Sequence, residues 1–234
     1  PAPRPSAGAV TARPAMPPTG RPITLRITEI FHSLQGETSR AGLPTVFVRL
    51  TGCPLRCSWC DTEYSFTGGT TRSLDDILAE VASHHCQTVC VTGGEPLSQK
   101  NCLPLLSALC DAGYSVSLET SGAIDISGVD PRVSRIMDLK APGSGEEARN
   151  LLANIPLLTL RDELKLVLAS EADYEWAKAR IAEYSLTQRC PVLLAPVQGQ
   201  LRPADLAAWI LRDRLPVRMQ VQLHKIIWGN EPGR

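Results

Sequence analysis

Residues 52–61 read GCPLRCSWCD and place three cysteines, Cys53, Cys57 and Cys60, within eight residues. The apolar run at residues 46–50 comes shortly before them, so we expect the three thiols to lie in a loop that follows a strand, where they can converge on one centre. Structural zinc takes four cysteine or histidine ligands, and ordinary iron–sulfur clusters take four cysteines. Three thiols therefore leave one coordination position open, where a metal can bind a substrate or cofactor.

A zinc site completed by a distant histidine is the alternative that the spacing leaves open. Its possible fourth ligands are His84, His85 and His224. A disulfide scaffold is excluded, because eight cysteines in 234 residues are roughly 3%, well below the roughly 8–10% that marks such proteins. In a reducing compartment, clustered cysteines more often serve a metal or a reaction.

The rest of the chain alternates between strand and helix patterns. Strands are predicted at residues 23–30, 46–50, 88–91, 115–119, 135–139, 164–168, 192–195 and 217–223, and helices at residues 73–83, 103–112, 171–184 and 203–212. This alternation favours parallel strands joined by crossover helices, in a single α/β domain spanning residues 23–234. Residues 1–22 contain seven of the nineteen prolines, and we predict a disordered tail there.

Composition narrows the classes of partner. Lys plus Arg number 24 and Asp plus Glu number 24, so the formal net charge is zero and no chain-wide basic field exists to hold a nucleic acid or an anionic membrane. No apolar stretch approaches the roughly 20 residues that cross a bilayer. We therefore expect a cytoplasmic protein that acts on a small molecule.

Polar motifs follow several of the predicted strands. Residues 92–96 read TGGEP, and the successive glycines Gly93 and Gly94 let the backbone approach a ligand without a Cβ in the way. Glu119 ends the next strand, where a carboxylate can accept hydrogen bonds from ribose hydroxyls, although a solvated loop glutamate gives the same pattern. Residues 138–140 read DLK and end the following strand, and a lysine there either binds a carboxylate or is simply exposed.

The spacing C-x-x-x-C-x-x-C after the first core strand, followed by Gly-Gly-Glu-Pro, resembles the radical S-adenosylmethionine (SAM) superfamily. The resemblance implies a partial (β/α) barrel of mostly parallel strands. It also implies that Cys53, Cys57 and Cys60 hold a [4Fe-4S] cluster whose fourth iron binds SAM, and that an electron donor such as flavodoxin or ferredoxin reduces it. The residues expected around SAM are Gly94, Glu119, Asp138, Leu139, Lys140 and Gln198.

A narrower resemblance depends on residues 33–37, which read SLQGE. Together with Arg49, CDT at residues 60–62, the TGGEP motif and LHK at residues 223–225, they are similar to the 7-carboxy-7-deazaguanine synthase family over residues 27–228. That family converts 6-carboxy-5,6,7,8-tetrahydropterin to 7-carboxy-7-deazaguanine by radical ring contraction with loss of ammonia, in queuosine and deazapurine biosynthesis. Because the radical is carried by the cofactor, the resemblance implies no catalytic side chain.

The resemblance also implies the substrate contacts, which are Leu34, Gln35, Gly36, Glu37, Arg49, Thr92 and His224. Glu37 and the neighbouring backbone can bind the donors of a pterin edge, and Arg49 can clamp the carboxylate with two charge-assisted hydrogen bonds. Thr62 is expected to share Mg²⁺ with the substrate carboxylate, because hydroxyl and carboxylate oxygens suit this ion.

Each of these assignments has a plainer alternative. Arg49 alone could be a structural ion pair, Glu37 a surface charge, Thr62 a turn or helix cap, and His224 a satisfied core histidine. For the whole chain, the alternatives are a glycyl-radical-enzyme activase, which shares the cysteines and the Gly-Gly-Glu-Pro turn but acts on a partner protein, and a non-catalytic zinc-binding module. The family resemblance also implies a homodimer.

Overall fold

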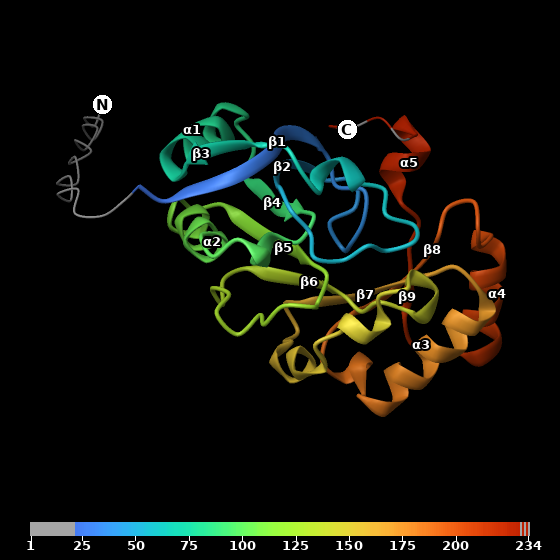
Figure 1. The fold of residues 1–234 in the computed structure, drawn as a ribbon. Helices are drawn as coiled ribbons and strands as arrows, with labels where there is room; N and C mark the ends of the chain where they lie inside the picture. Colours follow the sequence, from blue (N-terminus) through green and yellow to red (C-terminus); the bar gives the residue numbers. More distant parts are fainter. Residues whose placement is uncertain (1–21, 230, 232, 234) are drawn as a thin grey trace, which may run out of the picture.

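The computed structural model describes residues 22–229, 231 and 233, and within them the chain forms one nine-stranded sheet with the order β3-β1-β2-β4-β5-β6-β7-β8-β9 (Figure 1). The strands are β1 (Thr24–Leu34), β2 (Pro44–Leu50), β3 (Thr70–Ser73), β4 (Thr88–Gly93), β5 (Ser115–Thr120), β6 (Ser134–Asp138), β7 (Glu163–Leu168), β8 (Val192–Pro196) and β9 (Arg218–Met219). The predicted tail, residues 1–22, lies outside the described residues except for Pro22.

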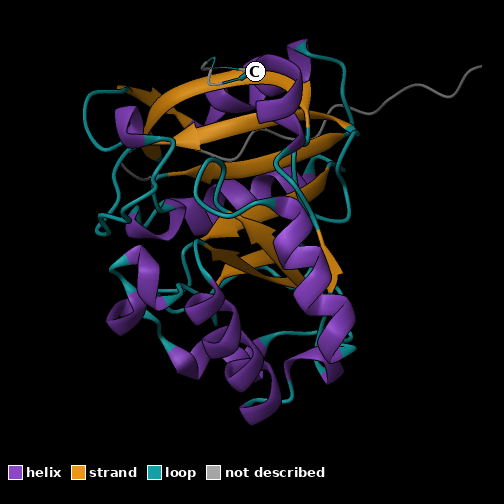
Figure 2. Ribbon diagram, turned by 90° about the vertical axis from the view of Figure 1, so that its right-hand side faces the viewer, coloured by secondary structure: helices purple, strands orange, loops and turns teal. Residues whose placement is uncertain are grey.

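From β2 to β9, neighbouring strands of the sheet are parallel, which confirms the predicted α/β class with mostly parallel strands. The helices between them are α1 (Leu74–Ser83), α2 (Cys102–Asp111), α3 (Glu171–Glu183) and α4 (Pro203–Asp213). They lie along the outer side of a curved sheet, which stays open with β3 and β9 at its edges (Figure 2). The carboxyl ends of the parallel strands therefore meet at one rim, where such folds bind their ligands.

Two of the helices begin at residues that favour a helix start. The Oγ of Ser73 accepts a hydrogen bond from the backbone N–H of Asp76 at 3.1 Å, and Pro203 occupies the first turn of α4, where its missing N–H leaves no helical bond unmade. None of the helices in the described part of the chain has the length and apolar character needed to span a membrane.

One edge of the sheet differs from the alternating pattern. β1 pairs antiparallel with both β2 and β3, and β3 was not predicted. The link between β1 and β2, residues 35–43, is too short for a crossover, which needs a dozen or more residues, so the two strands form a hairpin. β3 has only four residues, all partly or fully exposed, and gives no hydrophobic signal.

The strand predicted at residues 217–223 is wrong over most of its length. Only Arg218 and Met219 pair with β8, and the chain then turns into helix α5 (Leu223–Trp228). The backbone N–H of Leu223 donates to the carbonyl of Gly36 at 2.9 Å, so this segment bonds to the β1–β2 link and not to the sheet. α5 consequently lies beside the cysteine loop, at the same rim (Figure 1).

Candidate active site

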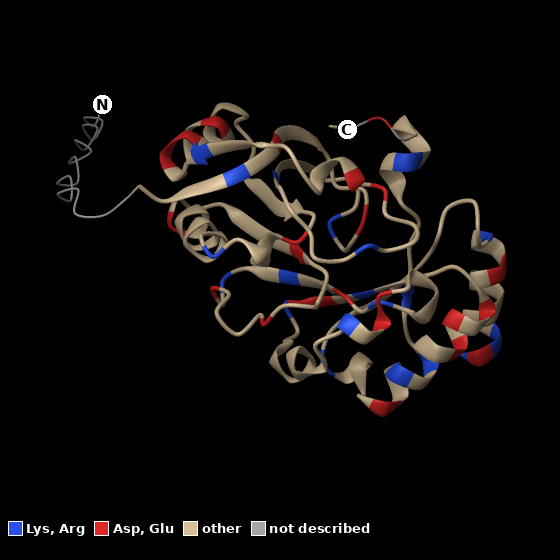
Figure 3. Ribbon diagram, in the orientation of Figure 1, with Lys and Arg blue, Asp and Glu red and all other residues tan. Residues whose placement is uncertain are grey.

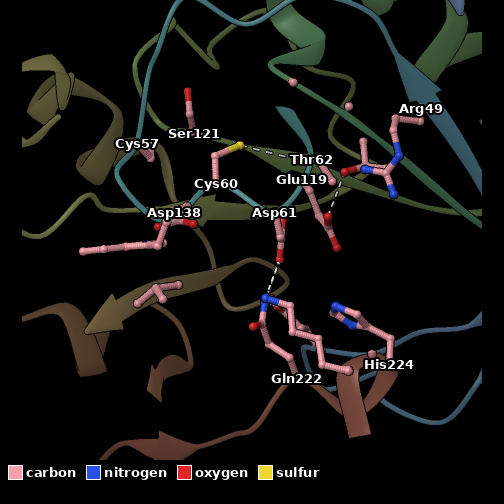
Figure 4. Close-up of a pocket in the computed structure, with 18 of the residues that line it drawn as sticks. Arg49, Cys57, Cys60, Asp61, Thr62, Glu119, Ser121, Asp138, Gln222 and His224 are labelled. Carbon is pink, nitrogen blue, oxygen red and sulfur yellow. Dashed lines mark hydrogen bonds and ion pairs between the residues drawn. The ribbon is translucent and has the colours of Figure 1, made fainter. Parts of the chain in front are cut away.

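A cavity of about 520 Å³ opens at the carboxyl ends of the parallel strands. Its walls come from the β1–β2 link, the cysteine loop, the ends of β4 to β8 and α5, and Figure 4 shows side chains from these elements around one space. The predicted site residues that line it are Leu34, Gln35, Gly36, Glu37, Arg49, Cys53, Cys57, Cys60, Thr62, Thr92, Gly94, Glu119, Asp138, Lys140, Gln198 and His224. Leu139 does not line it; its side chain is buried in the core.

The three cysteines lie along one wall of the cavity, half-buried and without a disulfide. Burial raises the pKa of the Cys53 and Cys57 thiols, and the nearby charge of Lys140 opposes this rise. No three His, Cys, Asp or Glu side chains among the described residues lie close enough together to hold a single metal ion, as a zinc site would require. A cluster instead binds each thiolate at a different iron, so three thiols spread along a wall fit it.

Thr62 follows the cysteine loop and precedes the 3₁₀ helix η1 (Glu63–Ser65). Its side chain makes no capping hydrogen bond, and its Oγ1 lies 3.9 Å from the Sγ of Cys60. The turn is present, because Thr62 occupies the N-cap position and its carbonyl accepts from the Ser65 N–H at 2.9 Å, but the hydroxyl does not cap the helix, and Thr62 lines the cavity.

The Gly-Gly-Glu-Pro turn joins three parts of the site. The Glu95 carboxylate is fully buried and accepts hydrogen bonds from the Leu97 N–H, the Thr120 hydroxyl, and both the N–H and hydroxyl of Ser121. These bonds fix the end of β4 to the end of β5. A Cβ at Gly94 would lie 2.4 Å from the carbonyl oxygen of Gly52, so glycine is needed here for close packing against the cysteine loop.

Adding that Cβ is expected to destabilise the protein. In Gly94→Ala the methyl group would also lie 2.6 Å from the Cβ of Cys53, so the cysteine loop must shift, and overpacking of this kind costs about 1–3 kcal/mol. Thermal unfolding should show a clear decrease in Tm relative to Gly128→Ala, whose new methyl meets only the end of the Leu103 side chain. Equal Tm values for the two variants would show that the packing is looser than described.

Glu119 lies between the residues predicted for cofactor and substrate. Its Oε2 accepts a hydrogen bond from the Thr92 hydroxyl at 2.8 Å, and its Oε1 accepts one from Gln35 Nε2 at 3.3 Å. It is half-buried, so the alternative of a solvated loop glutamate is wrong. Gln35 and Thr92 are 3% and 5% exposed, and the three side chains form one fixed polar wall.

Glu37 is also buried, and the alternative of a surface charge is wrong. Its Oε2 lies 2.5 Å from Lys165 Nζ, and its Oε1 accepts a hydrogen bond from Gln222 Nε2 at 2.7 Å. Burial alone raises the pKa of the Glu37 carboxyl, but the charge of Lys165 and the two hydrogen bonds outweigh burial and lower it. Glu37 is therefore an ionised acceptor at neutral pH.

On the other side of Lys165, Asp138 and Lys140 form a second ion pair. Asp138 Oδ2 lies 3.0 Å from Lys140 Nζ and 3.7 Å from Lys165 Nζ. The Lys140 side chain is largely buried, so the alternative of an exposed loop lysine is wrong. The Oδ1 of Asp138 is buried without a hydrogen-bond partner among the described residues, and Asp138 is one of the residues that line the cavity.

Arg49 is held in place by an ion pair and two rings. Its Nε donates to Glu29 Oε1 at 2.7 Å, and the Tyr64 hydroxyl donates to the same oxygen at 2.7 Å. The guanidinium carbon lies 5.7 Å from the centroid of the Phe31 ring and 5.8 Å from that of Tyr64. The structural ion pair is therefore present, yet Arg49 still lines the cavity.

α5 closes the cavity with polar side chains. A Cβ at Gly36 would lie 2.1 Å from His224 Nδ1, so the glycine admits the imidazole. His224 belongs to this helix and not to a core strand, and burial lowers its pKa, which keeps the ring neutral at pH 7. Lys225 Nζ pairs with Asp61 Oδ2 at 2.7 Å, and Gln222 bonds both Asp61 and Glu37.

Sequence reasoning missed several polar residues of this site, among them Tyr64, Lys165, Gln222 and Lys225, which line the cavity, and Glu29, which holds Arg49. Lys165 alone carried a usable signal, because a lysine between leucines in a buried strand needs a partner. The others act through contacts between distant segments.

Comparisons with known proteins agree with this geometry. The model of the radical SAM superfamily matches residues 47–183. The 7-carboxy-7-deazaguanine synthase of Chlorobaculum tepidum is 52% identical over 208 residues, which cover 88% of this chain and 94% of that protein. The synthase of Koribacter versatilis is 41% identical over 222 residues, covering 88% and 98%.

Comparison of the fold with solved structures agrees with the sequence comparisons. The crystal structure of QueE from Escherichia coli superposes with a TM-score of 0.71 at 26% identity, and the match covers 86% of this chain and 95% of that one. These matches favour neither an activase nor a zinc-binding module. The chain is a member of the radical SAM superfamily and, within it, of the 7-carboxy-7-deazaguanine synthase family.

Proposed function

We propose that this protein converts 6-carboxy-5,6,7,8-tetrahydropterin to 7-carboxy-7-deazaguanine with loss of ammonia. One observation carries the proposal: a wall of three cysteines and a polar wall containing Gln35 and Glu37 line the same cavity. A cluster-bound cofactor and a small heterocycle can therefore meet in one space. The name shared by the relatives described above supports this substrate.

The cofactor side is assigned to the cysteine wall and the ends of β4 to β8. Cys53, Cys57 and Cys60 would hold the [4Fe-4S] cluster, and Gly94, Glu119, Asp138, Lys140 and Gln198 would contact SAM, whereas Leu139, which is buried in the core, is left out of this set. The cluster and SAM, when bound, supply a carbon-centred radical that removes a hydrogen atom from the substrate. The buried cation Lys140 suits the SAM carboxylate, and the unpaired Oδ1 of Asp138 suits a hydrogen-bond donor.

The substrate side is assigned to the β1–β2 link and the residues that surround it. The ionised Glu37 can accept the N–H donors of the pterin edge, and the backbone of residues 34–36 can complete this recognition. The stacked rings of Phe31 and Phe47, with centroids 4.9 Å apart, provide an apolar wall. Such a wall excludes water from the reacting heterocycle.

Arg49 can clamp the substrate carboxylate, and Thr62 can bind a magnesium ion that the same carboxylate shares. Asp61 lies beside Thr62, and its pKa is lowered, because the charge of Lys225 outweighs the effect of burial. An ionised carboxylate therefore lies next to Thr62 in the chain and lines the same cavity, which suits a hydrated Mg²⁺. The family resemblance supports three further proposals. A flavodoxin or ferredoxin donates the electron, the protein is a homodimer, and it is located in the cytoplasm.

Conversion of the proposed substrate tests this function. We expect anaerobically reconstituted protein, given SAM, a reductant and Mg²⁺, to produce 7-carboxy-7-deazaguanine and ammonia, measured by mass spectrometry and an ammonia assay. Protein without reductant is the control and should produce neither. Formation of 5′-deoxyadenosine with a different small molecule, but no product from the carboxypterin, would mean that the substrate is wrong while the radical chemistry is right.

A further inference from the structure

Lys165 is a buried cation at the centre of the site. It lies in the middle of β7, flanked by leucines that are fully buried, and its side chain is 14% exposed. Its Nζ lies 2.5 Å from Glu37 Oε2 and 3.7 Å from Asp138 Oδ2. The ammonium is therefore fixed between a residue of the proposed substrate side and one of the proposed cofactor side.

The charges around this pair make Lys165 indispensable to Glu37. The titratable groups that face Glu37 or Lys165 are Asp61 of the cysteine loop, Glu119 of β5, Asp138 of β6, Lys140 after β6, and His224 and Lys225 of α5. Lys140 is paired with Asp138, and Lys225 with Asp61. Lys165 is thus the cation in direct contact with Glu37, and an uncompensated buried carboxylate is strongly unfavourable.

We infer that Lys165 is a positioning residue for substrate recognition, which keeps Glu37 ionised and aims its carboxylate at the pterin edge. A protonated Glu37 would carry a donor where the substrate also presents donors, and recognition would fail. This inference rests on the substrate-binding role proposed for Glu37. It assigns Lys165 no contact with the reacting atoms.

The pH dependence of substrate binding separates this role from a merely structural one. In the wild type the pKa of Glu37 is lowered, so the carboxylate is ionised throughout pH 7 to 9 and affinity should be flat. Without the cation, burial raises this pKa, by several units in documented cases, so the ionised fraction grows as pH rises. Asp61 and His224, whose pKa values are both lowered, do not titrate in this window.

The experiment measures the Kd of the carboxypterin by anaerobic calorimetry on unreduced holoenzyme with SAM, which does not turn over. Burial without the cation is expected to raise the pKa of Glu37 in Lys165→Met; if only about a tenth of the molecules then carry an ionised Glu37 at pH 7, Kd should rise about tenfold there and recover toward pH 9. Lys165→Arg should restore a flat profile. The double variant Lys165→Met/Glu37→Gln should be weak and flat.

Lys178→Met is the matched control. Lys178 lies on α3, where basic and acidic residues alternate on the outer side of the sheet (Figure 3), and it pairs with Glu175 and Asp213 away from the cavity. It should leave Kd unchanged. If Lys165→Met does not fold, Lys165→Gln, which keeps a hydrogen-bond donor without the charge, should show the same pH-dependent Kd.

The experiment distinguishes a failure of the role inferred for Lys165 from a failure of the role proposed for Glu37. A flat, wild-type-like Kd in Lys165→Met, or in Lys165→Gln where that variant is needed, overturns the inference. An unchanged Kd in the single variant Glu37→Gln would instead refute the role proposed for Glu37, whatever the conversion assay shows about the overall function.

Discussion

Replacing Cys57 with alanine is expected to reduce SAM cleavage to background. The three thiols of the cavity wall are the proposed ligands of one cluster, and each is expected to bind a different iron, so the loss of one cannot be compensated by the other two. Iron and sulfide counting should show incomplete or absent cluster after anaerobic reconstitution. Chromatography should detect no 5′-deoxyadenosine above that of protein-free controls.

Cys110→Ala is the control for this substitution. Cys110 is also a half-buried free cysteine, but it lies on α2 and does not line the cavity. It should retain full iron content and activity. A Cys57→Ala protein with a normal cluster and normal cleavage would remove Cys57 from the ligand set.

Arg49→Ala is expected to weaken substrate binding far more than binding or cleavage of SAM. Truncating one partner of a desolvated charge pair costs about 2–5 kcal/mol, which corresponds to an increase in KM of roughly 30- to several thousand-fold. The guanidinium is held by Glu29 and lies within 6 Å of the Phe31 and Tyr64 ring centroids, so its orientation is set before the substrate arrives. Substrate KM and the Kd of SAM should be measured on the same preparation.

Arg49→Lys separates charge from shape. Lysine keeps the charge but not the two-pronged geometry, so we expect a loss in affinity between those of the wild type and the alanine variant. Equal loss of substrate affinity and SAM cleavage in Arg49→Ala would contradict the clamp and would point to a general disturbance of the site, which circular dichroism would detect.

The sequence predicted which segments line the cavity, because the signals that mark them are local. Each of these signals is contained in a few consecutive residues: the cysteine spacing, the Gly-Gly-Glu-Pro turn and the acidic residues at strand ends. Because the strands are parallel, their carboxyl ends then meet at one rim of the sheet. That is why sixteen predicted residues from many segments line one cavity.

The contacts that the sequence could not predict are those between distant segments. Lys165 and Glu37 are 128 residues apart, and Gln222 and Glu37 are 185 apart, so no periodicity connects them. The last predicted strand was wrong for the same reason, because the Leu223 N–H bonds to Gly36 in the β1–β2 link. Tertiary bonds of this kind override local preference.

Glu95 shows a different limit. The sequence identified its motif, but not that its carboxylate would be fully buried and hydrogen-bonded to the end of β5. A motif that is recognised as a ligand contact can also hold the scaffold together. Both roles are carried by a turn in which Gly94 packs against the cysteine loop.

The most direct test of this account is the paramagnetic resonance spectrum of the reduced cluster, recorded with and without SAM. Three protein ligands leave one iron open, so SAM should change the spectrum of the wild-type protein, and one cluster per chain should respond. A cluster with four protein ligands, whose spectrum is unaffected by SAM, would contradict the assignment of this cavity as a radical SAM site.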